Sequence, residues 1–235
     1  FCVLDSPASE IPPDLHYPMI VKPKNEAVSF GIQIVKDEEE LRAGAKKIFD
    51  QFGQAVLVEQ YISGREINVG ILGNGDNPDV FMPAEIVFGE DGPQIYTWED
   101  KTRKSGREIR VECPAKISDE LSKKAQEVAK GAFRALGCYD CSRVDMRVDD
   151  QENLYILEIN SLPSLGEHGS YVEGAKQAGL DFPALVNRLV EVAAARYFGT
   201  PKPYELSNKT SDPSASAFNF LTARRDRMEK SLQDW

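Results

Sequence analysis

The sequence predicts an α+β fold with mostly antiparallel sheets, and three observations support this prediction. Two strand-like runs, 142–148 and 154–160, are joined by the turn-rich segment 149–153. Two further runs are separated by Asn74-Gly75, a dipeptide that is typical of β-hairpin turns. Amphipathic helices accompany these hairpins and can cover them, which is typical of α+β domains and not of parallel doubly wound sheets.

The first part of the chain alternates strands with one amphipathic helix. After a proline-rich segment over 1–17, we expect strands over 17–22 and 32–35. Asp37 is predicted to cap a helix, because three glutamates follow it where the helix dipole favours negative charge. Gly53 ends this helix. Its apolar side chains recur on one face: Leu41, Ala45, Ile48, Phe49 and Phe52.

The middle of the chain predicts strands over 55–61, 66–72 and 79–88, followed by a polar segment, 89–112, with weak signs of order. Ser118 is predicted to cap a second helix that Gly137 ends. The apolar face of this helix is expected to comprise Leu121, Ala125, Val128, Ala129, Ala132, Phe133 and Leu136.

In the last part of the chain, the sequence predicts two helices and a tail. A loop over 163–169 precedes a short helix that ends near Gly179. Asp181 is predicted to cap a helix from about Pro183 to Phe198, with Gly199 past its end. Residues 200–235 are interpreted as a linker or tail, and their charged stretch could form one amphipathic helix.

Composition narrows the function classes. The chain has 235 residues, a formal net charge of −10 and 41% hydrophobic residues, an ordinary globular balance. The acidic charge argues against a nucleic-acid partner, which needs a basic face. No apolar run approaches the ~18 residues of a membrane span, and no signal peptide is recognised. We therefore expect a cytoplasmic protein without a membrane partner. Because the chain starts at Phe1 and not at Met, in the middle of a strand-like run, we expect the true N-terminus upstream.

Four cysteines are present: Cys2, Cys113, Cys138 and Cys141. The pair Cys138 and Cys141 forms a lone CxxC motif, which is weak support for a zinc site that usually needs four ligands. The interpretation we favour is reduced thiols packed beside a helix end.

The two strands of the 142–160 hairpin carry an oxygen-rich set of side chains. Alternation places Arg143, Asp145 and Arg147 on one face of the first strand, and Glu158 and Asn160 on one face of the second. A hairpin register could bring Asp145, Glu158 and Asn160 together as the oxygen ligands that Mg²⁺ prefers. The alternative is a half-exposed hairpin whose polar residues face water, and the pattern leaves both interpretations open.

Three other segments could contact a nucleotide. Lys22 ends a buried strand, from which a cation can reach a phosphate. The loop 24–31 is rich in donors and small residues but lacks P-loop spacing. Consecutive backbone groups over Glu59–Ile62 could recognise an adenine edge, and Glu66 could accept hydrogen bonds from a ribose. Each feature by itself is equally consistent with a scaffold role.

Four segments in unbroken order resemble the ATP-grasp enzymes and, within them, the D-alanine–D-alanine ligase family. The resemblance covers about residues 17–199. Because it rests on four separated motifs with consistent spacing, it is more specific than any one of them. The segments are VKPKNEAVSFGI, VLVEQYISGREINVGIL, RVDMRV and LEINSLPSLGEHGSY.

The resemblance implies roles for residues of the nucleotide site. Lys22 corresponds to a lysine that contacts the phosphates, and Glu66 to the acid that binds the ribose. Lys101 looks like the lysine of a mobile loop that reaches the γ-phosphate. The segment that contacts adenine comprises Glu59, Gln60, Tyr61 and Ile62.

The resemblance also implies reaction residues. Ser29 lies near the reacting groups, Gly31 lets its loop close, and Arg143 stabilises an oxyanion. The implied ligands of Mg²⁺ or Mn²⁺ are Asp145, Glu158 and Asn160, with Glu158 bridging two ions. A loop from Ser161 would present N–H groups and small residues to an amino-acid carboxylate, with Ser164, Gly169 and Ser170 as its substrate residues.

This chain departs from the family pattern at three positions. Ser164 stands where the family usually has glycine, Gly169 where it usually has a serine that binds the second substrate, and Val28 where it has another serine. The family's N-terminal domain and the upstream lysine of its nucleotide site are also absent from this chain. These departures bear on the substrate more than on the use of ATP.

The implied fold is ATP-grasp, with two α+β lobes over 1–62 and 63–199 that grip ATP between them. The implied activity is that of an ADP-forming carboxylate–amine ligase of cell-wall peptidoglycan biosynthesis, which joins amino acids through an acyl phosphate. Loops 24–31 and 89–107 would act as lids over that intermediate. Ligases of this resemblance are often homodimers. Two alternatives stay open: an ATP-binding module without ligase activity, and a ligase for another amino acid, peptide or hydroxy acid.

Overall fold

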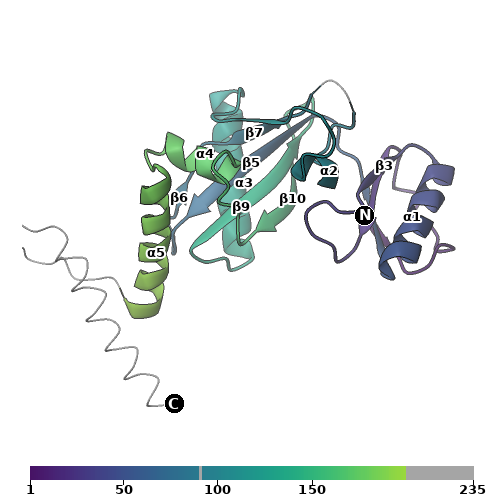
Figure 1. Cartoon of the computed structure of the whole chain (residues 1–235), viewed down its shortest axis with the longest axis horizontal. Coiled ribbons are helices and arrows are strands. Elements are labelled where there is room, and N and C mark those ends of the chain that lie inside the picture. Colours follow the sequence, from purple (N-terminus) through teal and green to yellow (C-terminus); the bar gives the residue numbers. More distant parts are fainter. Residues whose placement is uncertain (90–91, 200–235) are drawn as a thin grey trace, which may run out of the picture. The chain divides into compact units, whose positions relative to one another are not determined.

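The computed structural model describes residues 1–89 and 92–199, and Figure 1 shows their elements. Residues Phe1–Phe198 form one compact unit. The tail and helix expected over 200–235 lie outside the described residues. None of the helices within the described ranges is long and apolar enough to cross a membrane.

The elements alternate along the chain. The strands are β1 (Cys2–Leu4), β2 (Met19–Pro23), β3 (Gln33–Val35), β4 (Val56–Gln60), β5 (Arg65–Leu72), β6 (Asp79–Val80), β7 (Ala84–Val87), β8 (Arg110–Glu112), β9 (Cys141–Val148) and β10 (Leu154–Asn160). The helices are α1 (Glu38–Phe52), α2 (Trp98–Lys101), α3 (Asp119–Ala135), α4 (Ser170–Gln177) and α5 (Phe182–Phe198). The strand pairs of both sheets are antiparallel, which confirms the predicted α+β class.

A four-stranded sheet, in the order β1-β4-β2-β3, packs against α1. The helix begins as expected, because an Asp37 carboxylate oxygen accepts a hydrogen bond from the Glu40 N–H at 2.9 Å. It ends at Gly53, whose φ of 62° is the left-handed conformation that glycine adopts without strain. Its buried residues Leu41, Ala45 and Ile48 form the core with the sheet, as the apolar stripe predicted.

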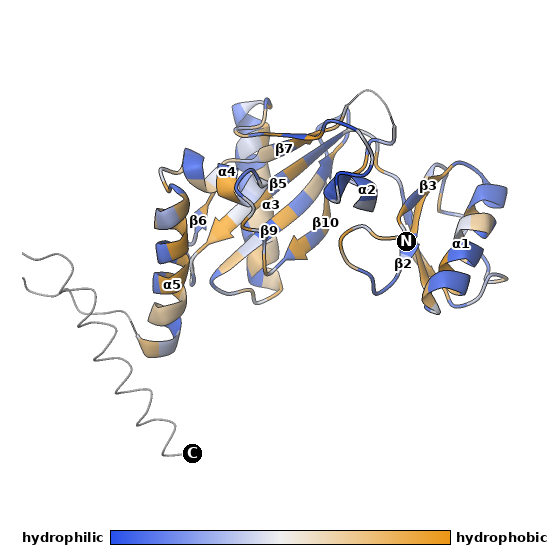
Figure 2. Ribbon diagram, in the orientation of Figure 1, coloured by the Kyte–Doolittle hydropathy of each residue, from blue (hydrophilic) through white to orange (hydrophobic). Residues whose placement is uncertain are grey.

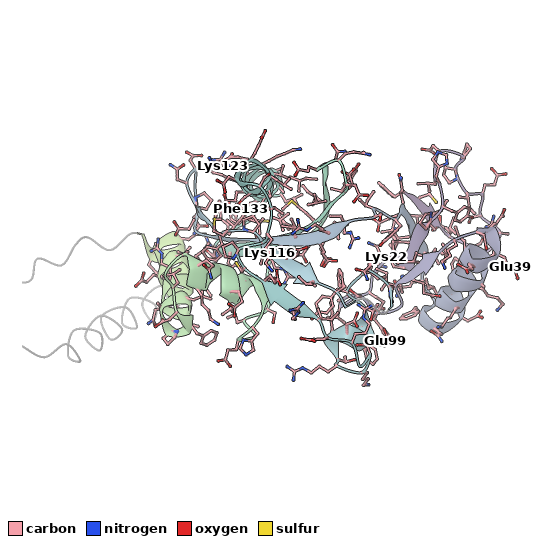
Figure 3. All side chains as sticks on the ribbon, turned by 90° about the horizontal axis from the view of Figure 1, so that it is seen from above. Lys22, Glu39, Glu99, Lys116, Lys123 and Phe133 are labelled. Carbon is pink, nitrogen blue, oxygen red and sulfur yellow. The ribbon has the colours of Figure 1, made fainter. Side chains whose placement is uncertain are left out.

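A six-stranded sheet, in the order β10-β9-β5-β7-β8 with β6 paired to β5, has one apolar face. Alternate residues of β5 and β9 point to this face, and α3 covers it (Figure 1). Figure 2 shows the apolar residues along both strands, and Figure 3 shows Phe133 of α3 directed towards the sheet while Lys123 points away. The core residues are Val69, Ile71, Ala125, Ala129, Phe133, Val144 and Met146.

The opposite face of this sheet is divided between packing and polar groups. At one end, Tyr171 of α4 packs with Leu72 and Phe81. Gly70 permits this approach, because a Cβ there would lie 2.7 Å from Phe81 and 2.8 Å from Tyr171. Towards the other end of β5 the same face carries Asn68 and Glu66. The side of the sheet left uncovered by α4 is therefore polar.

Three expectations from the sequence are wrong in detail. The predicted strand over 79–88 is two strands, β6 and β7, because the chain leaves the ladder around Pro83, which lacks an N–H. The segment 89–112 contains α2 and β8 within its described part. Leu136 is 68% exposed and lies off the apolar face, because α3 ends at Ala135 and Leu136 follows as its cap.

The remaining helix boundaries agree with the sequence. An oxygen of Ser118 accepts from the Leu121 N–H at 3.1 Å, and one of Asp181 accepts from the Ala184 N–H at 2.9 Å. Gly199, with a φ of 79°, follows α5. The hairpin turn also forms as expected, since a carboxylate oxygen of Asp149 accepts from the N–H groups of Gln151 and Asn153.

Candidate active site

Three neighbouring strands place polar side chains side by side on the face opposite α3. Strand β9 lies between β5 and β10, so its residues 143–148 have a partner on both sides. Asp145 pairs with Glu158 and Asn68, and Arg143 pairs with Asn160 across β10. Antiparallel partners directly opposite each other have Cβ atoms about 5 Å apart, which places these side chains in contact.

A β-bulge in β10 decides which side chains join this group. The register runs regularly to Ile156↔Met146 and then shifts, so that Glu158 pairs with Asp145. Had the register continued without this shift, Leu157 would oppose Asp145, and Glu158 would oppose Val144 and face α3. The bulge therefore brings Glu158 and Asn160 to the polar face, and the structure brings together the three predicted metal ligands.

Short hydrogen bonds hold the carboxylates of this cluster. The Arg143 guanidinium donates to both oxygens of Asp145, from Nε at 2.6 Å and from Nη2 at 2.7 Å. The Asn160 amide donates to Asp145 Oδ2 at 2.9 Å and to Glu158 Oε1 at 3.0 Å. One amide thus links the two carboxylates.

The donor set fits a hard divalent cation. Two carboxylates and an amide offer oxygen ligands, the type that Mg²⁺ and Mn²⁺ prefer. Among residues 1–89 and 92–199, no cluster of three or more His, Cys, Asp or Glu side chains is placed to hold a metal. The candidate site therefore depends on Asn160 as its third oxygen donor.

Buried carboxyl groups characterise the same face. Burial is the main cause that raises the pKa of Glu66 to about 7, and the nearby Asp145 carboxylate raises it further. Burial likewise raises the pKa of Asp145, while Arg143 opposes this shift. Carboxyl groups with strongly shifted pKa values occur often at functional sites.

Lys101 reaches this region from α2. A capping box starts that short helix, with the Thr97 oxygen and the Asp100 carboxylate each accepting from the other's backbone N–H. Lys101 Nζ lies 2.8 Å from Ser29 Oγ and donates to it. Desolvation lowers the pKa of Lys101, and the carboxylates of Glu158 and Glu66 partly offset this effect. The structure therefore joins the predicted lysine to the predicted loop serine.

The loop that carries Ser29 adopts a strained backbone. Val28 and Ser29 have φ values of 55° and 60°, a region that β-branched residues rarely adopt. Gly31 has a φ of 81°, and a Cβ there would lie 2.9 Å from Pro23. The ring of Phe30 packs 5.3 Å from that of Trp98 at the start of α2. Two loops far apart in the sequence thus meet at Ser29 and Phe30.

Lys22 and Glu59 form an ion pair across β2 and β4, and both side chains are partly exposed. Figure 3 marks Lys22 on its strand. The pair links the predicted phosphate contact with the first residue of the predicted adenine segment. Next to it, the Tyr61 N–H donates to the Pro18 carbonyl at 3.1 Å, which fixes the chain as it leaves β4.

The predicted substrate loop ends at the start of α4, where Gly169 is the N-cap. Ser170 is buried, and its oxygen accepts from the Asn68 amide at 3.0 Å. The other atom of that amide, Asn68 Oδ1, has no hydrogen-bond partner among the described residues. Ser164 Oγ accepts from the Gly166 N–H at 3.2 Å, which shapes the loop. In this structure the hydrogen bond from Asn68 to Ser170 thus ties the end of this loop to β5.

Sequence reasoning gave no role to Arg147, Asn68 or Arg107, which the structure places around the site. Arg147 is buried beside Glu66, and Arg107 forms an ion pair with Asp100 at 3.2 Å. A charged residue within the otherwise apolar MRV run was the signal for Arg147. The Thr97 to Asp100 spacing was a capping-box signal within the segment of weak order.

Known proteins resemble this chain over most of its length. The family model described as D-ala D-ala ligase C-terminus matches residues 5–191. The uncharacterized protein y4sG of Sinorhizobium fredii is 40% identical over 186 residues, which cover 79% of this chain and 55% of that protein. The D-alanine–D-alanine ligase of Syntrophobacter fumaroxidans is 37% identical over 190 residues, which cover 77% and 59%.

Solved structures have the same fold. The VanG D-Ala:D-Ser ligase of Enterococcus faecalis superposes with a TM-score of 0.65 at 31% identity, over 76% of this chain and 50% of that one. The D-alanine–D-alanine ligase of Bacillus anthracis also superposes with a TM-score of 0.65, at 23% identity over 83% of this chain and 60% of that one. These likenesses confirm the predicted ATP-grasp fold. The chain spans about half the length of the curated relatives it matches. On the match of the family model to residues 5–191, the chain belongs to the D-alanine–D-alanine ligase family, as a representative of its C-terminal, ATP-grasp part.

Proposed function

We propose that this chain is the ATP-grasp part of an ATP- and Mg²⁺-dependent carboxylate–amine ligase that joins amino acids and releases ADP and phosphate. The observation that carries the proposal is the convergence of Arg143, Asp145, Glu158 and Asn160 on one sheet face. Membership of the ligase family supports it. In this proposal residues 1–62 and 63–199 are the two lobes, and the product serves cell-wall peptidoglycan synthesis.

The reaction would proceed in two steps. The substrate carboxylate attacks the γ-phosphorus of ATP, the bond to the bridging oxygen breaks, and ADP leaves. The amine of a second substrate then attacks the acyl carbon, loses a proton and expels phosphate. Both steps concentrate negative charge on oxygen, which fixed cations and N–H groups stabilise.

Asp145, Glu158 and Asn160 would hold Mg²⁺ or Mn²⁺, with Glu158 between two ions. A bound divalent ion would neutralise phosphate oxygens and favour their displacement. For Asp145, metal binding would compete with the present pairing to Arg143. The Arg143 guanidinium would then be released towards the acyl centre, where it can stabilise an oxyanion.

The two lysines would hold the phosphates. Lys22 ends a rigid strand and is paired with Glu59, a partner that ATP phosphates can replace. Lys101 already contacts Ser29, so the same contact would close the loop 24–31 over the γ-phosphate. Closure of both loops would keep water from the acyl phosphate.

The nucleoside and amino-acid contacts complete the proposal. Backbone groups over Glu59, Gln60, Tyr61 and Ile62 would bind the adenine, and Glu66 the ribose. The loop that ends at α4 would bind the amino-acid carboxylate, with Ser164, Gly169 and Ser170 as its substrate residues. The anchoring of Ser170 by Asn68 favours a contact from the loop backbone and not from the serine hydroxyl. A homodimer is included in this proposal on the basis of the family.

A panel assay tests the function. The full-length protein is incubated with ATP, Mg²⁺ and pairs drawn from D- and L-amino acids, dipeptides and hydroxy acids. We expect at least one pair to stimulate ADP release and to yield a condensation product that mass spectrometry identifies. Nucleotide binding without stimulated ADP release by any pair would instead support a module that binds ATP without ligase activity.

The identity of the second substrate depends on the residues around Gly169. Gly169 caps α4 without a side-chain hydrogen bond and offers no hydroxyl to the substrate. The related VanG protein is named as a D-Ala:D-Ser ligase. We therefore include D-serine beside D-alanine in the panel, and the ratio of the two products measures the choice.

A further inference from the structure

Arg147 is the most deeply buried cation of the polar face. Its side chain is 3% exposed, whereas that of Arg143 on the same strand face is 19% exposed. An arginine stays charged in proteins, so its burial is costly unless its donors are satisfied. The burial of the Arg147 charge therefore requires partners for its donors.

Those partners are mostly main-chain carbonyl groups. Arg147 Nε donates to the Ile62 carbonyl at 3.0 Å, and Nη2 donates to the Gly64 carbonyl at 2.9 Å. Nη1 donates to the Gln94 carbonyl at 2.8 Å. Three carbonyls from two separate segments thus converge on one guanidinium.

Two side chains of the same region complete the contacts. Arg147 Nη1 lies 3.7 Å from Glu66 Oε2, an ion pair between direct neighbours in the sheet. The guanidinium carbon lies 5.5 Å from the centre of the Tyr61 ring, a cation–π distance. Arg147 contacts Tyr61, Ile62 and Glu66, which are three of the residues proposed to bind the nucleoside.

The segment that Arg147 holds connects the two sheets. Residues 61–64 run from the end of β4 to the start of β5. The Tyr61 N–H donates a hydrogen bond to the Pro18 carbonyl, and the Ile62 carbonyl accepts one from Arg147 Nε. These two bonds fix the peptides on both sides of the Ile62 N–H, which leaves that group in a defined direction. A fixed donor of this kind is what an acceptor on a purine edge requires.

The contact with Gln94 extends this arrangement to a second segment. Gln94 lies four residues before α2, the helix that bears Lys101. The neighbouring Pro93 carbonyl is held by Arg107 Nη1 at 2.6 Å, and Arg107 in turn pairs with Asp100 of α2. Two arginines therefore tie the start of this loop to the connecting segment and to the lysine-bearing helix.

We propose that Arg147 is a positioning residue for nucleobase binding: its guanidinium fixes the segment 61–64 in the direction that recognises the base and joins that segment to the loop that bears Lys101. The inference rests on the proposed function and adds to it a residue that determines affinity for the base. A lysine cannot replace this arginine, because one ammonium group cannot reach carbonyls that lie around a planar fork.

The test compares nucleotide binding by the full-length protein with Arg147→Lys, which keeps the positive charge beside Glu66. Titration calorimetry with a non-hydrolysable ATP analogue and, separately, with inorganic tripolyphosphate distinguishes the base from the phosphates, both in Mg²⁺. We expect about tenfold or greater loss of affinity for the ATP analogue. Affinity for tripolyphosphate should stay within about twofold, since Lys22 and Lys101 are unchanged.

Arg188→Lys is the matched control. Arg188 lies on α5, outside the proposed nucleotide site, and forms ion pairs with Asp79 and Glu191. This variant should bind both probes as the wild type does. A thermal melt of each variant shows whether it is folded at the titration temperature. Should Arg147→Lys unfold, Tyr61→Leu, which removes the ring and keeps the guanidinium, serves as the second variant with the same expected discrimination between probes.

Three outcomes decide the matter. Equal affinity of the wild type and Arg147→Lys for the ATP analogue would overturn the positioning role and leave the proposed function intact. An equal loss for the ATP analogue and tripolyphosphate would also overturn it, because the effect would then be general. A wild type that binds neither probe would refute the proposed function and, with it, this inference.

Discussion

The two ends of the polar face on β9 carry the same residue type in different surroundings. At one end, Arg143 is paired with the Asp145 carboxylate, which can change partner when a metal or phosphate arrives. At the other end, Arg147 is held by three main-chain carbonyls, which cannot leave without moving the backbone. In the proposed function, Arg143 would therefore change partner when ligands bind, whereas Arg147 would keep two segments in place.

Alternation along a strand therefore predicts the face on which a side chain lies, but not the role of that side chain. Arg143 and Arg147 are four residues apart and point to the same face, so sequence periodicity treats them alike. Their surroundings differ because Arg143 is bonded to the Asp145 carboxylate beside Glu158 and Asn160 of β10. Arg147 is instead bonded to carbonyl groups of the segment 61–64. The following predictions test whether the two ends work separately.

The largest effect is expected for Asp145→Asn. Loss of this carboxylate weakens the proposed Mg²⁺ site and frees Arg143 from its partner, so Mg²⁺-dependent ADP release should fall at least about 10³-fold. Steady-state kinetics over a range of Mg²⁺ concentrations measure it. Asp150→Asn, an exposed carboxylate in the same hairpin turn, is the control and should retain wild-type rates. Retained turnover in Asp145→Asn would show that the metal site is wrongly assigned.

A somewhat smaller effect is expected for Arg143→Lys. Because this guanidinium is proposed to stabilise an oxyanion, kcat should fall by about 10²-fold while the KM for ATP changes little. Arg147→Lys should show the opposite division, with the larger change in ATP affinity. Arg110→Lys, an exposed arginine on β8, is the control. A rise in KM without loss of kcat in Arg143→Lys would remove the distinction between the two ends.

A stability effect is expected for Glu66, which lies beside Arg147 at the second of these ends. Its pKa is about 7 in the folded chain against an ordinary value of 4.5, so the folded state retains this proton longer than the unfolded state. The favourable contribution is complete below about pH 4.5 and is lost as pH rises to about 7. The loss is at most about 3.5 kcal/mol, since the two pKa values differ by about 2.5 and each unit corresponds to about 1.4 kcal/mol.

Glu66→Gln should remove this dependence. Urea unfolding of wild type and variant without metal, from pH 4.5 to 8, gives the difference in the free energy of unfolding at each pH. The variant should gain stability relative to wild type as pH rises through this window. If the difference in the free energy of unfolding does not change with pH, the pKa of Glu66 is the same in the folded and unfolded states, and its burial on this face does not destabilise its charged form.

The smallest effect is expected for Thr97→Ala, which removes one half of the capping box of α2. The cap contributes about 1 kcal/mol to local stability, so amide hydrogen exchange over 97–104 should become roughly fivefold faster. Turnover should fall a few-fold, because Lys101 is presented by this helix. Thr102→Ala, which removes a hydroxyl from the other end of α2, is the control. Unchanged exchange in Thr97→Ala would show that the cap does not hold the helix.

The sequence by itself determined the α+β class, most strand and helix positions, and the family. These follow from local rules: capping oxygens at Asp37, Ser118 and Asp181, glycine at Gly53, and alternation along the strands. The ordered motifs also predicted which residues to examine at the site. Local rules were sufficient because each of these features depends on neighbours within a few residues.

The tertiary structure decided the rest. The bulge at Leu157 determines that Glu158 joins Asp145, and no local pattern predicts where a register shifts. The contact of Lys101 with Ser29 and the burial of Arg147 likewise depend on segments distant in sequence. The physical reason is common to all of them: the partner that satisfies each polar group is supplied by a different part of the chain, and that partner fixes its role.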